Sequence, residues 1–341
     1  MSTQNNEREE VYSVAISGRV AINNHALNNE KTVGNQNMAR TVNVFDKDLN
    51  ERQVNAISGQ MLKYIQNKHM LDLAKDFKKK EGEDLMCDGC YHEMSNKIKG
   101  DNKFMEENKS SDKSSAISEA IKACIGDDIG GIMVTSTTLN FSRKSAMNFG
   151  VSYNIPEVDT KESMMNVKYS DEEIEVKDEE NMTEEQREKN EEEVANNNGQ
   201  NIFHQETVSG QQVFNARFDS YKVSLNEIKQ EYALEQDKRE ERYLLALKSL
   251  FYTLTNKEGA KTSTFLPDVL GVEGTISVAY DTSPAPMYSP LNDDYKEEIE
   301  KIAENKKALD ERVETYHFSN QSELMDILVD LYQNTTPYRR V

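Results

Sequence analysis

The segment Val11 to Ile22 (VYSVAISGRVAI) constrains the fold more strongly than any other part of the sequence. Its residues are mostly β-branched, small or apolar, which is typical of a strand buried in a sheet. An Asn-rich stretch, Asn23 to Asn37, follows it and predicts a loop. Further strands are predicted at Thr41–Phe45, Arg143–Ile155 and Thr275–Tyr280, and a hairpin turn at Ser209-Gly210 is predicted between Ile202–Val208 and Gln211–Phe218.

Apolar residues at helical spacing predict four helices, at about 53–78, 236–255, 293–316 and 322–333. Ser58-Gly59 interrupts the first helix, where a glycine costs about 1 kcal/mol relative to alanine. Either the helix begins after Gly59 or another group must approach closely there. The order of elements favours an α+β fold, with helices on one face of an antiparallel sheet.

The net charge of −20 is unfavourable for nucleic-acid binding, which needs lysine and arginine to neutralise phosphates. The acidity is concentrated, however, because Glu157 to Glu193 contains 16 acidic and 5 basic residues. Residues 1–70 contain 8 basic and 7 acidic residues and are close to neutral. The N-terminal part of the chain can therefore still provide a surface for nucleic acid.

Several classes of protein do not fit the sequence. No apolar run approaches the roughly 18 residues of a membrane span, and the N-terminus does not resemble a secretion signal. Three cysteines, an odd number, fit the reducing cytoplasm. The five histidines are scattered, and no HExxH or phosphate-binding loop motif occurs, so we expect no enzymatic activity.

Five segments, taken in order, resemble the DevR-type Cas-seven family, the backbone subunits of type I CRISPR Cascade complexes, and type I-B in particular. Each segment alone is weakly specific, whereas five in the right order are fairly specific. The segments are SGRVAINNHALNNEKTVGNQNMAR (Ser17–Arg40), NAISGQMLKY (Asn55–Tyr64), DDIGGIM (Asp127–Met133) with Arg143-Lys144-Ser145 after it, IFHQETVSGQQVF (Ile202–Phe214) and GAKTSTFLP (Gly259–Pro267).

The resemblance implies a modified RRM, or ferredoxin-like, palm with large insertions. Residues 1–78 and 143–155, together with 202–341 and its C-terminal helices, would form the palm. Residues 79–142 would form the fingers, and the acidic residues 156–201 a thumb-like insertion. Such subunits bind the guide (crRNA) along its length and present it for pairing with target DNA in antiviral defence or guided targeting. They join head to tail into a helical filament, beside Cas-five-like and large Cascade subunits.

Guide binding without sequence specificity needs donors to phosphate and ribose groups. Amide and basic side chains between Ser17 and Arg40 provide such donors, with Glu30 as the only carboxylate, although the segment can also be an ordinary turn-rich loop. The start of the first helix can attract an anion, or can be a solvated surface. Arg143 and Lys144 form a basic pair that can bind RNA or can equally be solvated. The candidates are Arg19, Asn23, Asn24, Asn28, Asn35, Arg40, Ser58, Gly59, Gln60, Lys63, Arg143 and Lys144.

Cys87 and Cys90 form a C-x2-C pair, with His92 and Cys124 as further ligands for a structural zinc ion. The alternative is three free thiols, and no other cofactor is required. Asp127-Asp128 can bind a metal as a carboxylate pair, or cap the turn before Gly130-Gly131.

Two other functions compete with guide binding. Type III backbone subunits, which are related to this family, cut RNA with an aspartate in the loop after the first strand. Here residues 23–35 contain no aspartate, which argues against an RNA endonuclease. The acidic composition also fits an interaction protein unrelated to nucleic acid.

Overall fold

The computed structural model describes residues 8–168, 201–257 and 261–340. Residues 169–200, which make up most of the predicted thumb and of the acidic stretch, lie outside the described residues. No helix in the described ranges is both long enough and apolar enough to cross a membrane.

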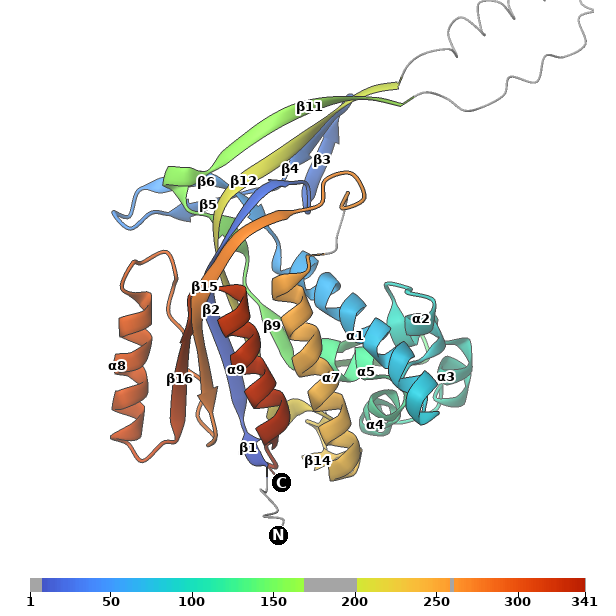
Figure 1. Ribbon diagram of the computed structural model, residues 1–341. Helices are drawn as coiled ribbons and strands as arrows, with labels where there is room; N and C mark the ends of the chain where they lie inside the picture. Colours follow the sequence, from blue (N-terminus) through green and yellow to red (C-terminus); the bar gives the residue numbers. More distant parts are fainter. Residues whose placement is uncertain (1–7, 169–200, 258–260, 341) are drawn as a thin grey trace, which may run out of the picture.

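A large antiparallel sheet forms the centre of the fold, with the strand order β16–β15–β2–β12–β10–β6–β5 (Figure 1). The predicted first strand is confirmed as β2, which lies between β12 and β15, so that Arg19 pairs with Val213 on one side and Glu273 on the other. The strands are β2 (Ser13–His25), β5 (Thr41–Phe45), β6 (Glu51–Ile57), β10 (Ser152–Asn154), β12 (Asn201–Phe218), β15 (Asp268–Ala279) and β16 (Val313–Phe318).

Side chains of β2 alternate between two apolar clusters. Ile16 belongs to the main core with Tyr243 and Leu247 of helix α7 (Gln236–Thr255). Ala15 belongs to a second cluster with Ala303 of helix α8 (Tyr295–Lys307). Helices therefore cover both faces of the sheet, and the prediction that they lie on one face is wrong. The small side chains on the α8 side leave room for this additional helix.

The predicted hairpin at Ser209-Gly210 is also wrong. These residues lie inside the continuous strand β12, at a bulge between Val208 and Gly210. A Cβ atom on Gly210 would lie 2.5 Å from Asn154 Nδ2, so the bulge needs a glycine for close approach. The part of β12 that precedes the bulge extends away from the body of the molecule and forms an arm with β3, β4 and β11 (Figure 1). These are β3 (Asn29–Val33), β4 (Gln36–Ala39) and β11 (Thr160–Lys168).

The Asn-rich stretch after β2 is a hairpin of β3 and β4 rather than a loop, with Gly34 in the left-handed region at its turn. The predicted strand at 143–155 is interrupted, because only short pieces of it pair with neighbours. The pieces are β8 (Asn140–Arg143), which pairs with β7 (Ile132–Thr135), then β9 (Met147–Phe149), which pairs with β12, and β10.

Helix α1 (Gly59–Glu81) begins at the predicted interruption, and the residues before it form β6. Helix α7 has the predicted bounds, and α9 (Gln321–Asn334) confirms the last predicted helix. The third helix ends early, at Lys307, because Val313–Phe318 pairs with β15 as strand β16.

The segment between α1 and β9 adds short helices on the side of α1 away from the sheet (Figure 1). Its apolar residues, such as Ile98, Ile121 and Phe141, belong to the main core. The chain ends meet where β1 (Glu9–Val11) pairs in parallel with β17 (Thr335–Pro337). The remaining elements are α2 (Asp88–Tyr91), the 3-10 helix η1 (Lys97–Gly100), α3 (Asn102–Glu107), α4 (Lys113–Ala123), α5 (Ile125–Gly130), the 3-10 helices at Pro156–Val158 and Ser220–Lys222, β13 (Leu225–Asn226) and β14 (Glu231–Tyr232).

Candidate nucleic-acid interface

Three predicted site residues meet at the start of α1. The backbone N–H of Ser58 donates to Asn28 Oδ1 at 2.8 Å, and Ser58 Oγ accepts from the N–H of Met61 at 3.2 Å. The Arg40 backbone donates to the carbonyl of Asn28 at 3.0 Å and accepts from Ala56 at 2.9 Å. The side chain of Arg40 is half-buried, and its Nε has no hydrogen-bond partner among the described residues. Asn28 therefore links the Arg40 backbone to the N-terminus of α1.

Gly59 is the first residue of α1 and allows this helix to start against a strand. A Cβ atom there would lie 2.5 Å from the carbonyl oxygen of Phe149 in β9. The close approach explains why a glycine occupies a position where it costs helix stability. The first turn carries no acidic residue, so the positive end of the helix dipole has no carboxylate in that turn to balance it.

A pocket of about 230 Å³ lies between the first half of α1 and the loop that precedes η1; we call it the α1 pocket. Gln60 and Lys63, both predicted site residues, line it together with Lys68, Lys97 and Glu93. Glu93 is paired with Lys75 outside the pocket at 3.0 Å. Among the described residues the lining therefore has three lysines and a single carboxylate, which makes it attractive to an anion.

Burial of Lys63, and then the nearby charge of Lys97, lowers the pKa of the Lys63 ammonium to about 8. A bound phosphate would stabilise the charged form and raise that pKa again. Lys97 Nζ donates to the carbonyl of Gly126 at 2.9 Å, which holds it at the pocket. Asn67 also lines the pocket, and no donor from the described part of the chain reaches its buried Oδ1. Cations and an unpaired amide oxygen suit the phosphate and the 2′-hydroxyl of RNA, respectively.

Other predicted residues lie apart from this pocket. Asn23 donates to Asp268 Oδ2 on the neighbouring strand at 3.2 Å. Asn24 is exposed and its backbone N–H donates to Ser209 Oγ at 3.0 Å, while Asn35 lies at the exposed turn of the β3–β4 hairpin. Lys144 is exposed. The structure therefore divides the predicted set between the arm, the sheet and the start of α1.

Arg19 is already bound within the protein. Its Nε donates to the carbonyl of Pro290 at 2.6 Å, and its Nη2 donates to the carbonyl of Asn292 at 3.1 Å and to Asp293 Oδ1 at 2.9 Å. The side chain is 12% exposed. These contacts give Arg19 a structural role, holding the loop before α8 against β2.

We expect Arg19→Ala to lower the free energy of unfolding by about 2 kcal/mol, because it removes several hydrogen bonds from a buried charged group. Arg40→Ala should lower it by no more than about 1 kcal/mol, since Arg40 Nε has no partner to lose within residues 8–168, 201–257 and 261–340. Urea unfolding of the two variants beside the unchanged chain measures both losses. Equal losses, or a larger loss for Arg40→Ala, would contradict these assignments.

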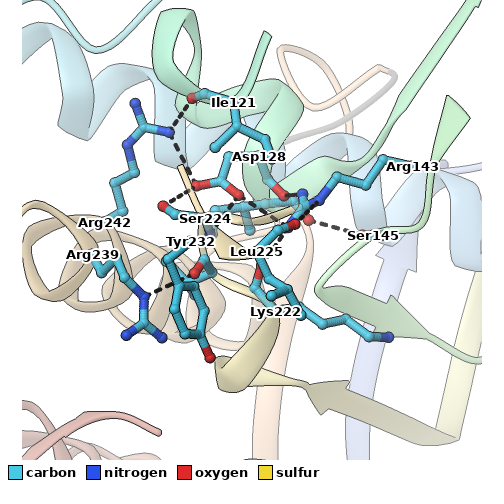
Figure 2. A network of polar contacts seen from close by, with 12 residues as sticks. Ile121, Asp128, Arg143, Ser145, Lys222, Ser224, Leu225, Tyr232, Arg239 and Arg242 are labelled. Atoms are coloured by element: carbon cyan, nitrogen blue, oxygen red, sulfur yellow. Dashed lines mark hydrogen bonds and ion pairs between the residues drawn. The ribbon is translucent and has the colours of Figure 1, made fainter. Parts of the chain in front are cut away.

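The prediction that Arg143 binds RNA is wrong, because its side chain is only 1% exposed. Figure 2 shows Arg143 and Arg242 approaching the carboxylate of Asp128 from opposite sides. Arg143 Nη2 lies 3.2 Å from Asp128 Oδ1, and its Nε donates to the carbonyl of Leu225 at 3.0 Å. Arg143 therefore stabilises the core instead of reaching solvent.

The three cysteines gather with Asp127, and their ligand atoms all lie within 4.8 Å of one another. Hydrogen bonds from the thiols of Cys124 and then Cys90 lower the pKa of the Cys87 thiol below its ordinary value. His92, predicted as a ligand, is outside this group, because its Nε2 lies 3.3 Å from Asp88 Oδ1 on the exposed side of α2. Asp127 and Asp128 belong to different clusters, so they are not a metal-binding pair.

Sequence reasoning missed Asn67, Lys68 and Lys97. Asn67 lies four residues after Lys63, and Lys68 lies four residues after Tyr64, which also lines the pocket, so helical periodicity could have indicated both. Lys97 comes from the short helices after α1, and no local pattern indicates that it returns to this helix.

The proteins similar to this chain include one family and many solved structures, among them chains of two CRISPR surveillance complexes. A family model described as CRISPR-associated negative auto-regulator DevR/Csa2 matches residues 16–300. No curated protein matches the sequence. A chain of a "CRISPR RNA-guided surveillance complex, pre-nicking" is 11% identical, with 96% of both chains covered and a TM-score of 0.47. A chain of a "CRISPR RNA-guided surveillance complex" is 9% identical, with 93% of this chain and 98% of the other covered and a TM-score of 0.42.

Proposed function

This chain belongs to the family of CRISPR-associated proteins described as DevR/Csa2, and from that membership we propose that it binds guide crRNA as the repeating backbone subunit of a type I Cascade complex. The sequence most resembles type I-B. The subunit would join further copies head to tail in the cytoplasm, beside Cas-five-like and large subunits. It would present the guide for pairing with target DNA.

The observation that carries this proposal is the α1 pocket. The pocket is lined by three lysines, Lys63, Lys68 and Lys97, and lies beside α1, which has no acidic residue in its first turn. The whole chain, in contrast, has a net charge of −20. On an acidic protein, a positive site attracts phosphate at one place, while the rest of the surface repels it. Such a site suits a guide that must follow a fixed track.

We further assign the large antiparallel sheet to a modified RRM-like palm, with residues 79–142 as fingers and 156–201 as a thumb-like insertion. The arm formed by β11, β12 and the β3–β4 hairpin extends from this palm (Figure 1). Its predicted site residue Asn35 and the α1 pocket would contact different nucleotides of one guide. A head-to-tail interface that does not close gives the helical filament that this role needs.

We propose binding without catalysis. The stretch from Asn23 to Asn35 contains no aspartate, which is the residue type that the related RNA-cutting subunits use there. An RNA strand paired to the bound guide should therefore stay intact in the presence of Mg²⁺. Products at regular spacing would favour the endonuclease instead.

Co-expression of the full chain with a CRISPR array tests the proposal directly. We expect the purified protein to carry a nuclease-protected RNA of discrete length, because a polymer on a guide shields it along its length. Electrophoresis of the extracted RNA and its sequencing give the result, and an array with scrambled repeats is the control. A protein free of RNA, or one carrying random cellular RNA in equal amount, would overturn the proposal.

A further inference from the structure

The cysteine cluster lies away from solvent, at the junction of α1, α2 and α5. Cys87 caps α2, Cys90 lies within α2, Cys124 precedes α5, and Asp127 lies in the first turn of α5. All four side chains are buried, and all three thiols are free. Segments from about 87–90 and 124–127 thus bring four ligands for a soft divalent cation to one point.

The spacing of the ligand atoms fits a single ion. In a tetrahedral site with Zn–S bonds of about 2.3 Å, neighbouring ligand atoms lie about 3.8 Å apart. Cys87 Sγ lies 3.7 Å from Asp127 Oδ2, and no pair of ligand atoms exceeds 4.8 Å. Three thiolates with one carboxylate favour zinc over magnesium or calcium, which prefer oxygen ligands in larger number.

The surroundings also match a metal site. The N–H of Cys90 points at Cys87 Sγ at 3.4 Å, and the N–H of Ile98 donates to Asp127 Oδ2 at 3.2 Å. Both contacts orient a ligand atom through a backbone group that is not itself a ligand. A Cβ atom on Gly126 would lie 2.9 Å from Cys90 Sγ and 3.5 Å from Cys124 Sγ, so glycine keeps the space beside the sulfurs open.

We propose that Cys87, Cys90, Cys124 and Asp127 bind one structural Zn²⁺ ion. The four groups lie buried beside one another, and a cation bound between them would compensate the cost of burying polar groups together. The ion would join α2 and α5, whose own helical turns are too short to hold themselves together. The neighbouring ammonium of Lys97, bound to the Gly126 carbonyl, offsets part of the remaining negative charge. This inference does not depend on RNA binding.

The test is the metal content of the full chain purified from zinc-supplemented medium, measured by mass spectrometry. We expect about one zinc ion per chain. Cys87→Ser with Cys90→Ser should lose most of it, whereas His92→Ala, which changes a neighbouring residue outside the ligand set, should keep all of it. Since the serine variant can fail to fold, Asp127→Cys provides a second measurement, because a site of four thiolates should retain the ion.

Replacement of zinc by Co²⁺ gives an independent readout. The chain, stripped by a chelator and reloaded, should show the absorption bands of tetrahedral cobalt bound to thiolate. A chain without zinc that also fails to take up Co²⁺ would overturn the proposal, as would loss of the ion in His92→Ala. A disulfide between Cys87 and Cys90 in protein from the cytoplasm would overturn it too.

Discussion

Replacing Asp128 with alanine is expected to lower the free energy of unfolding by about 3–5 kcal/mol, because it leaves two buried arginines without their counter-ion. Arg242 Nη1 lies 3.0 Å from Asp128 Oδ2, and Arg143 Nη2 lies 3.2 Å from Oδ1. Ser224 adds hydrogen bonds from its N–H and its hydroxyl, both at 2.9 Å (Figure 2). All these groups are buried, so water cannot replace the carboxylate.

Thermal and urea unfolding of Asp128→Ala measure this loss. Glu119→Ala is the matched control, because Glu119 forms an exposed pair with Lys122 at 2.9 Å on the neighbouring helix α4. Its loss should stay below about 0.5 kcal/mol. If the two variants lose equal stability, Asp128 does not hold the arginines in the way described.

Reversal of one charge in the α1 pocket should have the largest effect on RNA binding. We expect Lys63→Glu to weaken binding of a labelled single-stranded repeat RNA by about tenfold or more, and to lower the salt dependence by about one phosphate contact. Lys307→Glu is the control, because it makes the same charge change at an exposed residue of α8, on the other face of the sheet. Fluorescence anisotropy over a range of salt concentrations measures both. Equal losses would show that net charge, rather than the pocket, governs binding.

The pH dependence of binding gives a sharper test of Lys63. Its pKa of about 8 is below the ordinary lysine value, and a bound phosphate would raise it. Above about pH 8 binding must then take up a proton, so affinity should fall by about tenfold between pH 7 and pH 9. Lys63→Arg keeps its charge over this range and should remove this part of the pH dependence. An unchanged pH profile in Lys63→Arg would exclude Lys63 from the contact.

The sequence predicted elements whose pattern is local. The leucines of residues 244–254 determine α7, whose bounds agree with prediction, and the apolar run after Val11 determines β2. The DevR-type resemblance is confirmed by the family match. The prediction of a hairpin at Ser209-Gly210 was wrong because serine and glycine occur both in turns and in bulges. Only the pairing of β12 with β2 distinguishes a bulge from a turn here. Strand β16 was not predicted because pairing with β15 determines it, whereas the spacing of its own apolar residues does not indicate a strand.

The site was predictable only in part, because the fold pairs charged residues that lie far apart in the sequence. Arg143 looked like a solvated or RNA-binding residue, since nothing in the sequence pairs it with Asp128. His92 follows Cys90 closely, yet the turn of α2 directs it to Asp88, while Asp127 comes to the cysteines from a different helix. Ser58, Gly59 and Lys63 were indicated correctly as one group because a helix start is a local feature. Their use in RNA binding stays a prediction.

The central place of β2 affects how the protein can be made. Its partners, β12 and β15, are synthesised much later than β2 itself, as Arg19 pairs with Val213 and Glu273. Until these strands are made, the apolar residues of β2 remain unpaired. Folding is also slow, because strands far apart in the sequence must pair. Yield of native protein should therefore depend on translation speed and chaperone supply, and early termination before β15 should give insoluble fragments.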